Sequence, residues 1–488
     1  MIGVDVGTSS AKGVSIDEHG KLLAEATRSY PVDMPHPGWS EQDPETWVKA
    51  TEEVLSELDA ENADGIGLTG QMHGLVALGS DGRPLRPAIL WNDGRSQPQA
   101  TAIEQRLGIE CLVDLSGNRA LAGFTAPKLA WLAEHEPDVH RRIARVLLPK
   151  DYVRFRLTGE RAIDMADASG TLMLDVANRR WSQEMLQAGE IDERMLPGLF
   201  ESPDVCGKVS AEGAAATGLK AGTPVVAGAG DQAAGATGMG IVAAGTVSAT
   251  IGTSGVVFAA TDRPALDPKG RLHTFCHAIP GRWHVMGVTQ SAGLSLRWFR
   301  DQFGSGAVDG RDPYDRLGDE AATIAPGCEG LLWTPYLMGE RTPHLDSKAR
   351  AALVGLTASH TRAHVIRAIL EGVAFSLRDS FTIFAEMNVP VRTIRLGGGG
   401  ARSPLWRQIQ ADVYGHEIEI VEAEEGAAYG AAILAGVGAK FWPTVDDACA
   451  KVVQVAHRVP HSDAVSVMNQ SYAAYRRVYP ATKAIFNS

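Results

Sequence analysis

A short Gly-Thr-Ser segment occurs twice in the 488-residue chain, each time directly after an apolar run. The first copy lies in DVGTSSAKGVSI at Gly7, Thr8 and Ser9, and the second lies in ATIGTSGVVFA about half the chain later. We interpret the repeat as one strand–turn–strand unit used in both halves of the chain. Small residues in such turns leave N–H groups and hydroxyls free to contact phosphate oxygens. One such turn alone is typical of an ordinary hairpin, so the prediction of phosphate binding depends on the pair.

The spacing of apolar residues predicts alternating strands and helices on both sides of this repeat. The predicted strands cover residues 2–6, 12–16, 21–30, 224–228, 247–251, 256–260 and 391–396, and the predicted helices cover 44–58, 362–387, 404–414 and 426–435. A chain of this length is expected to form more than one domain. The pattern restarts near residue 246, and we therefore predict an N-terminal domain over 1–240 and a C-terminal domain over 241–488.

Composition excludes several classes of function. The formal net charge of −12 argues against a basic surface for nucleic acid. The five cysteines are widely separated and form no CxxC pair, which argues against a zinc site and favours a reducing compartment. The N-terminus lacks the pattern of a signal peptide, and no apolar run approaches about 18 residues. We therefore expect a cytoplasmic protein with no membrane partner.

Two aspartates stand where phosphate chemistry needs a carboxylate. Asp231 lies in AGAGDQAAG, between a predicted strand and a run of small residues that would let a substrate approach. A hydroxyl becomes a good nucleophile when a base takes its proton, which Asp231 could do; the alternative is that it only caps the following helix. Asp5 precedes the first turn, where a hydrated Mg²⁺ could bridge it to phosphates.

Three other patterns do not support a function. Residues 65–70 fit GxGxxG, but a dinucleotide fingerprint must open a helix, and this segment continues as loop and strand. His135 and His140 are five residues apart with Pro137 between them, so a helix would not place both on one face. The chain also has no GxxxxGK[ST] segment, which excludes a P-loop kinase.

A series of longer motifs resembles the FGGY carbohydrate kinase family over nearly the whole chain. In family order they are DVGTSSAKG, PGWSEQDPETW, GQMHG, RPAILWNDGR, GFTAPKLAWL, LLPKDYVRFRLTGE, GDQAAGATG, IGTSG, PYLMGERTPH, LGGGGARSPLWRQIQAD and EGAAYGAA. The resemblance implies an α/β fold of two actin-like (ribonuclease-H-like) domains, with mixed sheets flanked by helices and a cleft between them. It also implies ATP and Mg²⁺ as cofactors, a small sugar as the other substrate, and a homodimer.

The resemblance assigns roles to the acceptor side of the site. It makes Asp231 the catalytic base and implies sugar contacts from Met72, His73, Asp93 and Gln232, where relatives often carry Asn in place of Gln232. Met-His at 72–73 favours phosphorylation of D-xylulose to D-xylulose 5-phosphate. Ribulose, a sugar alcohol or glycerol stays an alternative acceptor, and a non-catalytic sugar- or nucleotide-binding protein on the same scaffold is a further alternative.

The donor side follows from the same resemblance. The phosphates are expected to contact both turns, and the Gly run is expected to contact adenosine. The expected ATP-binding residues are Gly7, Thr8, Ser9, Lys12, Gly252, Thr253, Ser254, Gly398, Gly399 and Ser403, with Asp5 holding Mg²⁺ through water. We expect Trp91 to be a core residue. Glu340 and Arg341 either pair with each other or contact ATP.

Overall fold

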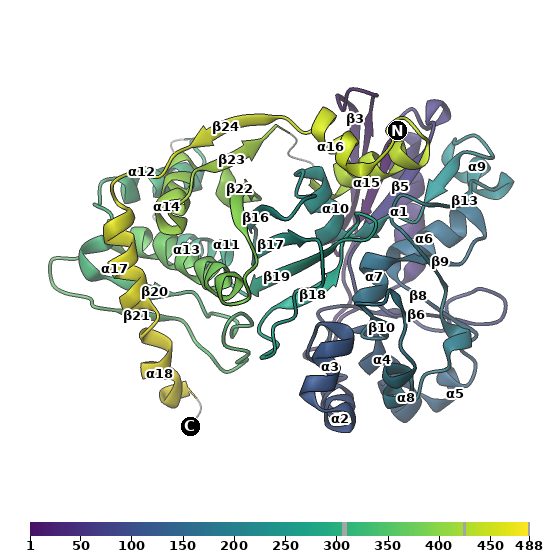
Figure 1. Cartoon of the computed structure of the whole chain (residues 1–488), viewed down its shortest axis with the longest axis horizontal. Helices are drawn as coiled ribbons and strands as arrows, with labels where there is room; N and C mark the ends of the chain where they lie inside the picture. Colours follow the sequence, from purple (N-terminus) through teal and green to yellow (C-terminus); the bar gives the residue numbers. More distant parts are fainter. Residues whose placement is uncertain (305–309, 423–425, 487–488) are drawn as a thin grey trace.

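The structure is a computed structural model, which describes residues 1–304, 310–422 and 426–486. Figure 1 shows two halves, each built around a twisted sheet with helices against it. The predicted α/β class with mixed sheets flanked by helices is therefore confirmed.

The first sheet has the order β13-β14-β5-β1-β2-β3, with β15 paired to β5. Its strands are β1 (Ile2–Val6), β2 (Ser10–Ile16), β3 (Leu22–Ser29), β5 (Ile66–Gly70), β13 (Val205–Lys208), β14 (Pro224–Val226) and β15 (Ala229–Gly230). The second sheet has the order β18-β19-β17-β16-β22-β23-β24. Its strands are β16 (Gly245–Ile251), β17 (Gly255–Thr261), β18 (His273–Cys276), β19 (Trp283–Thr289), β22 (Val391–Gly397), β23 (Ile418–Val421) and β24 (Val455–Val459).

The two sheets repeat one topology. Strand β1 pairs antiparallel with β2 and parallel with β5, and β16 pairs antiparallel with β17 and parallel with β22. The next strands also correspond, because β14 lies parallel to β5 and β23 lies parallel to β22. The duplication predicted from the two Gly-Thr-Ser segments is thus present in the strand order. The GxGxxG match at 65–70 falls mainly on β5 and opens no helix, as expected.

Helices cover both sheets. In the first half they are α1 (Pro44–Ser56), α2 (Gln97–Leu107), α3 (Ile109–Ser116), α4 (Thr125–His135), α5 (Pro137–His140), α6 (Pro149–Thr158), α7 (Met165–Ser169), α8 (Gln183–Gly189), α9 (Ala211–Thr217) and α10 (Asp231–Gly238). In the second half they are α11 (Gly293–Phe303), α12 (Pro313–Ala322), α13 (Arg362–Glu386), α14 (Pro404–Tyr414), α15 (Gly426–Gly438), α16 (Val445–Val452), α17 (Val465–Tyr475) and α18 (Val478–Phe486). Within the described segments, no helix combines the length and the apolarity needed to cross a bilayer.

Within the part of the chain that the structure describes, ten short strands lie outside the two large sheets. They are β4 (Glu41–Gln42), β6 (Val76–Leu78), β7 (Ala88–Ile89), β8 (Arg145–Leu147), β9 (Ala162–Asp164), β10 (Leu174–Asp175), β11 (Arg180–Trp181), β12 (Gly198–Phe200), β20 (Leu332–Thr334) and β21 (Ala352–Val354). These strands pair two by two.

Local signals explain where the first helix begins. The side chain of Asp43 accepts a hydrogen bond from the backbone N–H of Glu45, and Pro44 occupies the first turn. Both features are typical of a helix N-terminus. The apolar face of α1, with Trp47 and Val54 fully buried, then packs on β2 and β3.

Packing crosses the predicted boundary between residues 240 and 241. Helix α15 comes from the second half of the sequence but lies against β1, β5 and α10 of the first half (Figure 1). The approach is close: a Cβ atom added to Gly3 would lie 2.0 Å from the carbonyl oxygen of Ala428. The boundary itself falls between the end of α10 and the start of β16, and it stays a prediction.

Candidate active site

The two Gly-Thr-Ser segments are the three-residue connections from β1 to β2 and from β16 to β17. In the first turn the N–H of Gly7 donates to the carbonyl of Ser10, and in the second the N–H of Gly252 donates to the carbonyl of Ser254. The other N–H groups, those of Thr8, Ser9, Thr253 and Ser254, form no hydrogen bond with any described residue. Both turns therefore present free backbone donors, as an oxyanion or phosphate ligand requires.

Asp231 is the first residue of α10 and directly follows β15. The N-cap of this helix is Gly230, and no side-chain cap is formed, so the structure gives no support to a capping role for Asp231. Its side chain is partly exposed and lines a cavity of about 640 Å³ together with Gln232, Gly252, Ser254 and the Gly397–Gly399 segment. The predicted base, a predicted sugar contact and the second turn therefore meet in one cavity.

The charge of Asp231 acts on the carboxyl of Asp5. Burial raises the pKa of Asp5 to about 7, the charge of Asp231 adds to this, and Lys12 opposes it. Burial also raises the pKa of Asp231 to about 6. The Oδ1 atom of Asp5 is buried and has no hydrogen-bond partner among the described residues. Two neighbouring carboxylates, one with an unpartnered oxygen, fit the hard oxygen ligands that Mg²⁺ prefers.

Lys12 lies directly opposite Asp5 in the antiparallel register of β1 and β2. Its Nζ atom is also 3.6 Å from a carboxylate oxygen of Glu25 on β3. The ammonium group therefore lies on the face of the first sheet that also carries Asp5. This position is compatible with its predicted contact to phosphate.

Met72 and His73 lie in the loop that follows β5. His73 has a positive φ of 67°, and the N–H of Gly74 donates to the carbonyl of Met72 over 2.8 Å, which closes a three-residue turn. The His73 ring packs edge-on against Phe124, with ring centroids 4.7 Å apart. Its Nδ1 lies 2.5 Å from the carbonyl oxygen of Gly170.

That contact fixes the state of the His73 ring. A carbonyl oxygen only accepts, so Nδ1 carries the proton and donates. Burial lowers the pKa of His73 to about 3, while the bond to Gly170 opposes the shift. The ring is therefore neutral near pH 7, and Nε2 keeps a lone pair that can accept a hydrogen bond from a hydroxyl.

Gly230 brings Met72 close to Asp231. A Cβ atom added to Gly230 would lie 2.8 Å from Cγ of Met72 and 2.8 Å from Oδ1 of Asp167. The residue before the predicted base therefore has to be glycine for the Met72 side chain to fit. Met72 of the predicted Met-His contact therefore lies beside the residue that precedes the predicted base.

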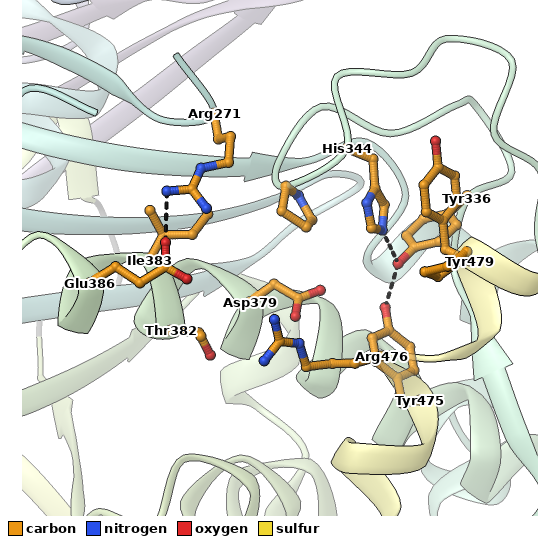
Figure 2. Close-up of a pocket in the computed structure, with 12 residues that line it drawn as sticks. Arg271, Tyr336, His344, Asp379, Thr382, Ile383, Glu386, Tyr475, Arg476 and Tyr479 are labelled. Atoms are coloured by element: carbon orange, nitrogen blue, oxygen red, sulfur yellow. Dashed lines mark hydrogen bonds and ion pairs between the residues drawn. The ribbon is translucent and has the colours of Figure 1, made fainter. Parts of the chain in front are cut away.

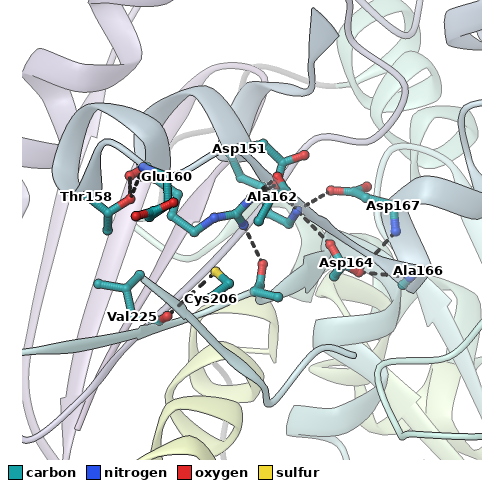
Figure 3. Close-up of polar contacts among 12 residues, drawn as sticks. Asp151, Thr158, Glu160, Ala162, Asp164, Ala166, Asp167, Cys206 and Val225 are labelled. Carbon is teal, nitrogen blue, oxygen red and sulfur yellow. Dashed lines mark hydrogen bonds and ion pairs between the residues drawn. The ribbon is translucent and has the colours of Figure 1, made fainter. Parts of the chain in front are cut away.

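A buried cluster of charged side chains, which includes Asp167, lies next to Gly230 (Figure 3). The ammonium of Lys150 contacts carboxylate oxygens of Asp151, Asp164 and Asp167 at 2.6, 2.7 and 2.8 Å, and all four side chains are fully buried. Asp164 also caps α7, and the next residue after α7 is Gly170, which binds His73. Sequence reasoning missed this cluster, because Lys150 and two of its acidic partners lie more than ten residues apart.

The structure corrects the prediction for Asp93. Its carboxylate accepts hydrogen bonds from the backbone N–H of Ser40 and Arg95 and from the guanidinium of Arg95. The Asp93 side chain is fully buried in this ion pair. The Arg95 guanidinium in turn stacks on Trp39, 3.6 Å from the ring centroid. Asp93 therefore holds the loop and offers no free oxygen to a sugar.

One further expectation was wrong, that for Trp91. For Glu340 and Arg341 one of the two alternatives, pairing, is not met, and contact with ATP stays a prediction. Trp91 is not a core residue: it is 42% exposed, and its indole N–H donates to the Thr8 hydroxyl of the first turn. Glu340 and Arg341 do not pair through their side chains among the described residues. Glu340 instead accepts hydrogen bonds from the backbone N–H groups of Gln290 and Arg341 and from the hydroxyl of Thr289.

Some of the predicted nucleotide residues line a second cavity, of about 430 Å³, beside the first. Thr253, Gly399 and Ser403 border it, and Gly398 lines the neighbouring cavity; their contact with ATP stays a prediction. Gly398 has a φ of 71°, and a Cβ atom there would lie 2.6 Å from the carbonyl oxygen of Ile251. Lining residues that sequence reasoning missed include Leu296, Arg297, Tyr314, Leu317, Ile366, Leu370 and Trp406. They come from α11, α12, α13 and α14, and no local motif links them.

A third cavity, of about 290 Å³, lies in the C-terminal half against α13 and α17 (Figure 2). Asp379, His344 and Arg476 border it, and the Tyr336 hydroxyl contacts both His344 and the Tyr475 hydroxyl. None of the predicted site residues lines this cavity. It is therefore separate from the cavity that contains Asp231.

The chain is similar in sequence and in structure to known sugar kinases. The xylulose kinase of Bacillus subtilis (strain 168) is 40% identical over 490 residues, which cover 99% of this chain and 97% of that protein. The xylulose kinase of Lactococcus lactis is 42% identical over 494 residues, with the same coverage. The crystal structure of xylulose kinase from Rhodospirillum rubrum superposes with a TM-score of 0.93 at 30% identity, covering 100% of this chain and 99% of the other.

Family models match both halves of the chain. The N-terminal domain of the FGGY family of carbohydrate kinases matches residues 1–238. The C-terminal domain of the same family matches residues 247–439. Together these matches cover most of the sequence, and the chain belongs to the FGGY family of carbohydrate kinases.

Proposed function

We propose that this carbohydrate kinase transfers the terminal phosphate of ATP to the 5-hydroxyl of D-xylulose, giving D-xylulose 5-phosphate and ADP. The observation that carries the proposal is twofold: Met72 packs against Gly230, the residue before Asp231, and Asp231 lines one cavity with the second Gly-Thr-Ser turn. The full-length similarity to xylulose kinases supports the choice of sugar. The same similarity supports catalysis over the non-catalytic alternative.

Asp231 acts as the general base in this proposal. The sugar hydroxyl gives its proton to the Asp231 carboxylate as its oxygen attacks the terminal phosphorus. Little other covalent chemistry is needed, because phosphoryl transfer depends mainly on positioning and on neutralising charge. Nε2 of His73 accepts a hydrogen bond from a second sugar hydroxyl, and Met72 packs against the carbon face of the sugar. Gln232 lies next to the base and supplies an amide for a further hydroxyl.

The two turns hold the phosphates through their free N–H groups, with Lys12 beside the first turn. Gly398, Gly399 and Ser403 line the wall against which adenosine lies. The 430 Å³ cavity holds the adenine ring. Mg²⁺ is proposed to be held near Asp5 through water. Bound there, the ion would offset negative charge on the phosphates.

The pH profile of kcat/KM for the sugar should show the ionisation of Asp231. Burial raises the pKa of this carboxyl to about 6, and only the carboxylate can accept the proton. At saturating Mg·ATP we expect kcat/KM to be level above about pH 7 and to fall about tenfold per pH unit well below pH 6. Unfolding must be monitored at each pH by fluorescence. A profile that stays level down to pH 5 with folded enzyme would contradict the assignment.

A substrate panel tests the proposed acceptor. ADP release is measured with D-xylulose, D-ribulose, xylitol and glycerol, each against a reaction without sugar. We expect the highest kcat/KM for D-xylulose, by at least about tenfold, because hydroxyl geometry decides such preferences. A higher kcat/KM for another compound would replace the proposed substrate. Release no faster than the sugar-free rate with every compound would favour the non-catalytic alternative.

A further inference from the structure

The backbone at His73 adopts a conformation that residues with side chains rarely adopt. Its φ of 67° lies in the left-handed region, and the Met72–Gly74 hydrogen bond closes the turn in the fewest possible residues. Such a conformation persists only where surrounding groups hold it in place. In this turn, hydrogen bonds to the carbonyl oxygen of His73 hold the backbone in place.

Two side chains of α4 donate to that oxygen. The ammonium of Lys128 lies 2.8 Å from the carbonyl oxygen of His73 and 2.6 Å from that of Gly123. The hydroxyl of Thr125 donates to the same His73 oxygen over 3.1 Å. Thr125 and Lys128 are three residues apart, so they lie on one face of the helix, and both are fully buried. Helix α4 thus contacts the loop at Met72 and His73 through two hydrogen bonds to the carbonyl oxygen of His73.

Burying the ammonium group of Lys128 at this position costs desolvation free energy. Burial lowers the pKa of Lys128 to about 7, and the charge of Asp93 only partly opposes the shift. Among the described residues, Lys128 forms no ion pair within salt-bridge distance, and its two hydrogen bonds both go to backbone carbonyls. An apolar side chain would fill the same space without this desolvation cost. We therefore attribute the presence of lysine here to its hydrogen bonds with the carbonyls of His73 and Gly123.

We propose that Lys128 is a positioning residue, which, together with Thr125, holds the turn at His73 so that the His73 ring faces the sugar. Lys128 does not touch the sugar itself. It acts through the backbone of His73, while the carbonyl of Gly170 fixes the ring from the other side. The inference rests on the proposed role of His73 in sugar binding, and it predicts an effect on the acceptor side of the site alone.

The test replaces Lys128 with methionine, which has a similar length and no donor. We expect KM for the best sugar substrate to rise about tenfold or more, because a charge-assisted hydrogen bond to the loop is lost. KM for ATP should stay within about twofold. The affinity for sugar without ATP, measured by calorimetry, should fall by the same factor as KM rises. Thr125→Val should give a smaller rise of about threefold.

A double variant makes the test specific. Lys128 and Thr125 bind one oxygen, so the effect of Lys128→Met with Thr125→Val should differ from the product of the single effects. Thr217→Val is the matched control, because Thr217 is also a buried threonine whose hydroxyl donates to a backbone carbonyl, that of Gly213 on α9. This control should lower the melting temperature and leave KM for the sugar unchanged.

Two outcomes would overturn the proposal. One is an unchanged KM for the sugar in folded Lys128→Met, and the other is an equal rise of KM for sugar and ATP. If Lys128→Met does not fold, Thr125→Val decides alone: a threefold rise supports the proposal and no change contradicts it. The substrate panel on the wild-type enzyme separately tests the proposed function, since the positioning effect is measured on whichever sugar it prefers.

Discussion

Asp231→Asn is expected to lower kcat by at least about a hundredfold while changing the dissociation constant of the sugar less than about threefold. The amide keeps the size and one acceptor oxygen of the carboxylate but cannot take a proton from the sugar hydroxyl. Its position at the start of α10, in the same cavity as the second turn, would be unchanged. Steady-state kinetics and calorimetry with the sugar measure the two quantities.

Asp379→Asn is the matched control for this variant. Asp379 likewise has a carboxyl whose pKa is raised by burial, to about 7, but it lines the separate cavity in Figure 2. Turnover of the folded control should stay within about twofold of the wild type. The assignment of Asp231 is contradicted if Asp231→Asn turns over at the wild-type rate, or if its loss of activity is matched by a loss of sugar affinity.

Gly430→Ala is expected to destabilise the whole protein. A Cβ atom at Gly430 would lie 1.8 Å from the carbonyl oxygen of Ala234, so α10 and α15 would have to move apart. Overpacking of this kind costs about 1–3 kcal/mol of unfolding free energy, and a clash with backbone is at the upper end. Because α10 carries Asp231 at its first residue, turnover should fall as well. Denaturant unfolding and kcat are the two measurements.

Gly426→Ala serves as the control for stability. Gly426 begins the same helix, but a Cβ atom there would meet no atom of the described residues within 4 Å. Alanine is also the better helix former, so the unfolding midpoint should stay or rise slightly. Equal unfolding midpoints for Gly430→Ala and the wild type would contradict the close approach of Gly430 on α15 to Ala234 on α10.

Local patterns predicted the parts of the fold that are made locally. The turns at Gly7 and Gly252 join neighbouring antiparallel strands, so their sequence alone indicates the duplicated unit. The position of α15 could not be predicted in the same way. Its Ala/Gly-rich sequence indicates close packing, but the partner strands β1 and β5 lie some 360 or more residues earlier.

The site shows the same division. Asp231, Met72 and His73 could be proposed from the sequence because each lies in a short motif at a strand end, and their roles stay predictions. The role of Asp93 was misjudged because its partner Arg95, only two residues away, was not considered as an ion pair. The second cavity was found only in part, because four helices contribute its walls. The homodimer and the cytoplasmic location stay predictions.

The most direct test of the account is to incubate the enzyme with Mg·ATP and D-xylulose and to identify the products by ³¹P NMR. The account predicts one new phosphate monoester, on the 5-hydroxyl, formed in a one-to-one ratio with ADP, and almost none with Asp231→Asn. ADP and free phosphate without a sugar ester would contradict it, as would an ester formed equally well by Asp231→Asn.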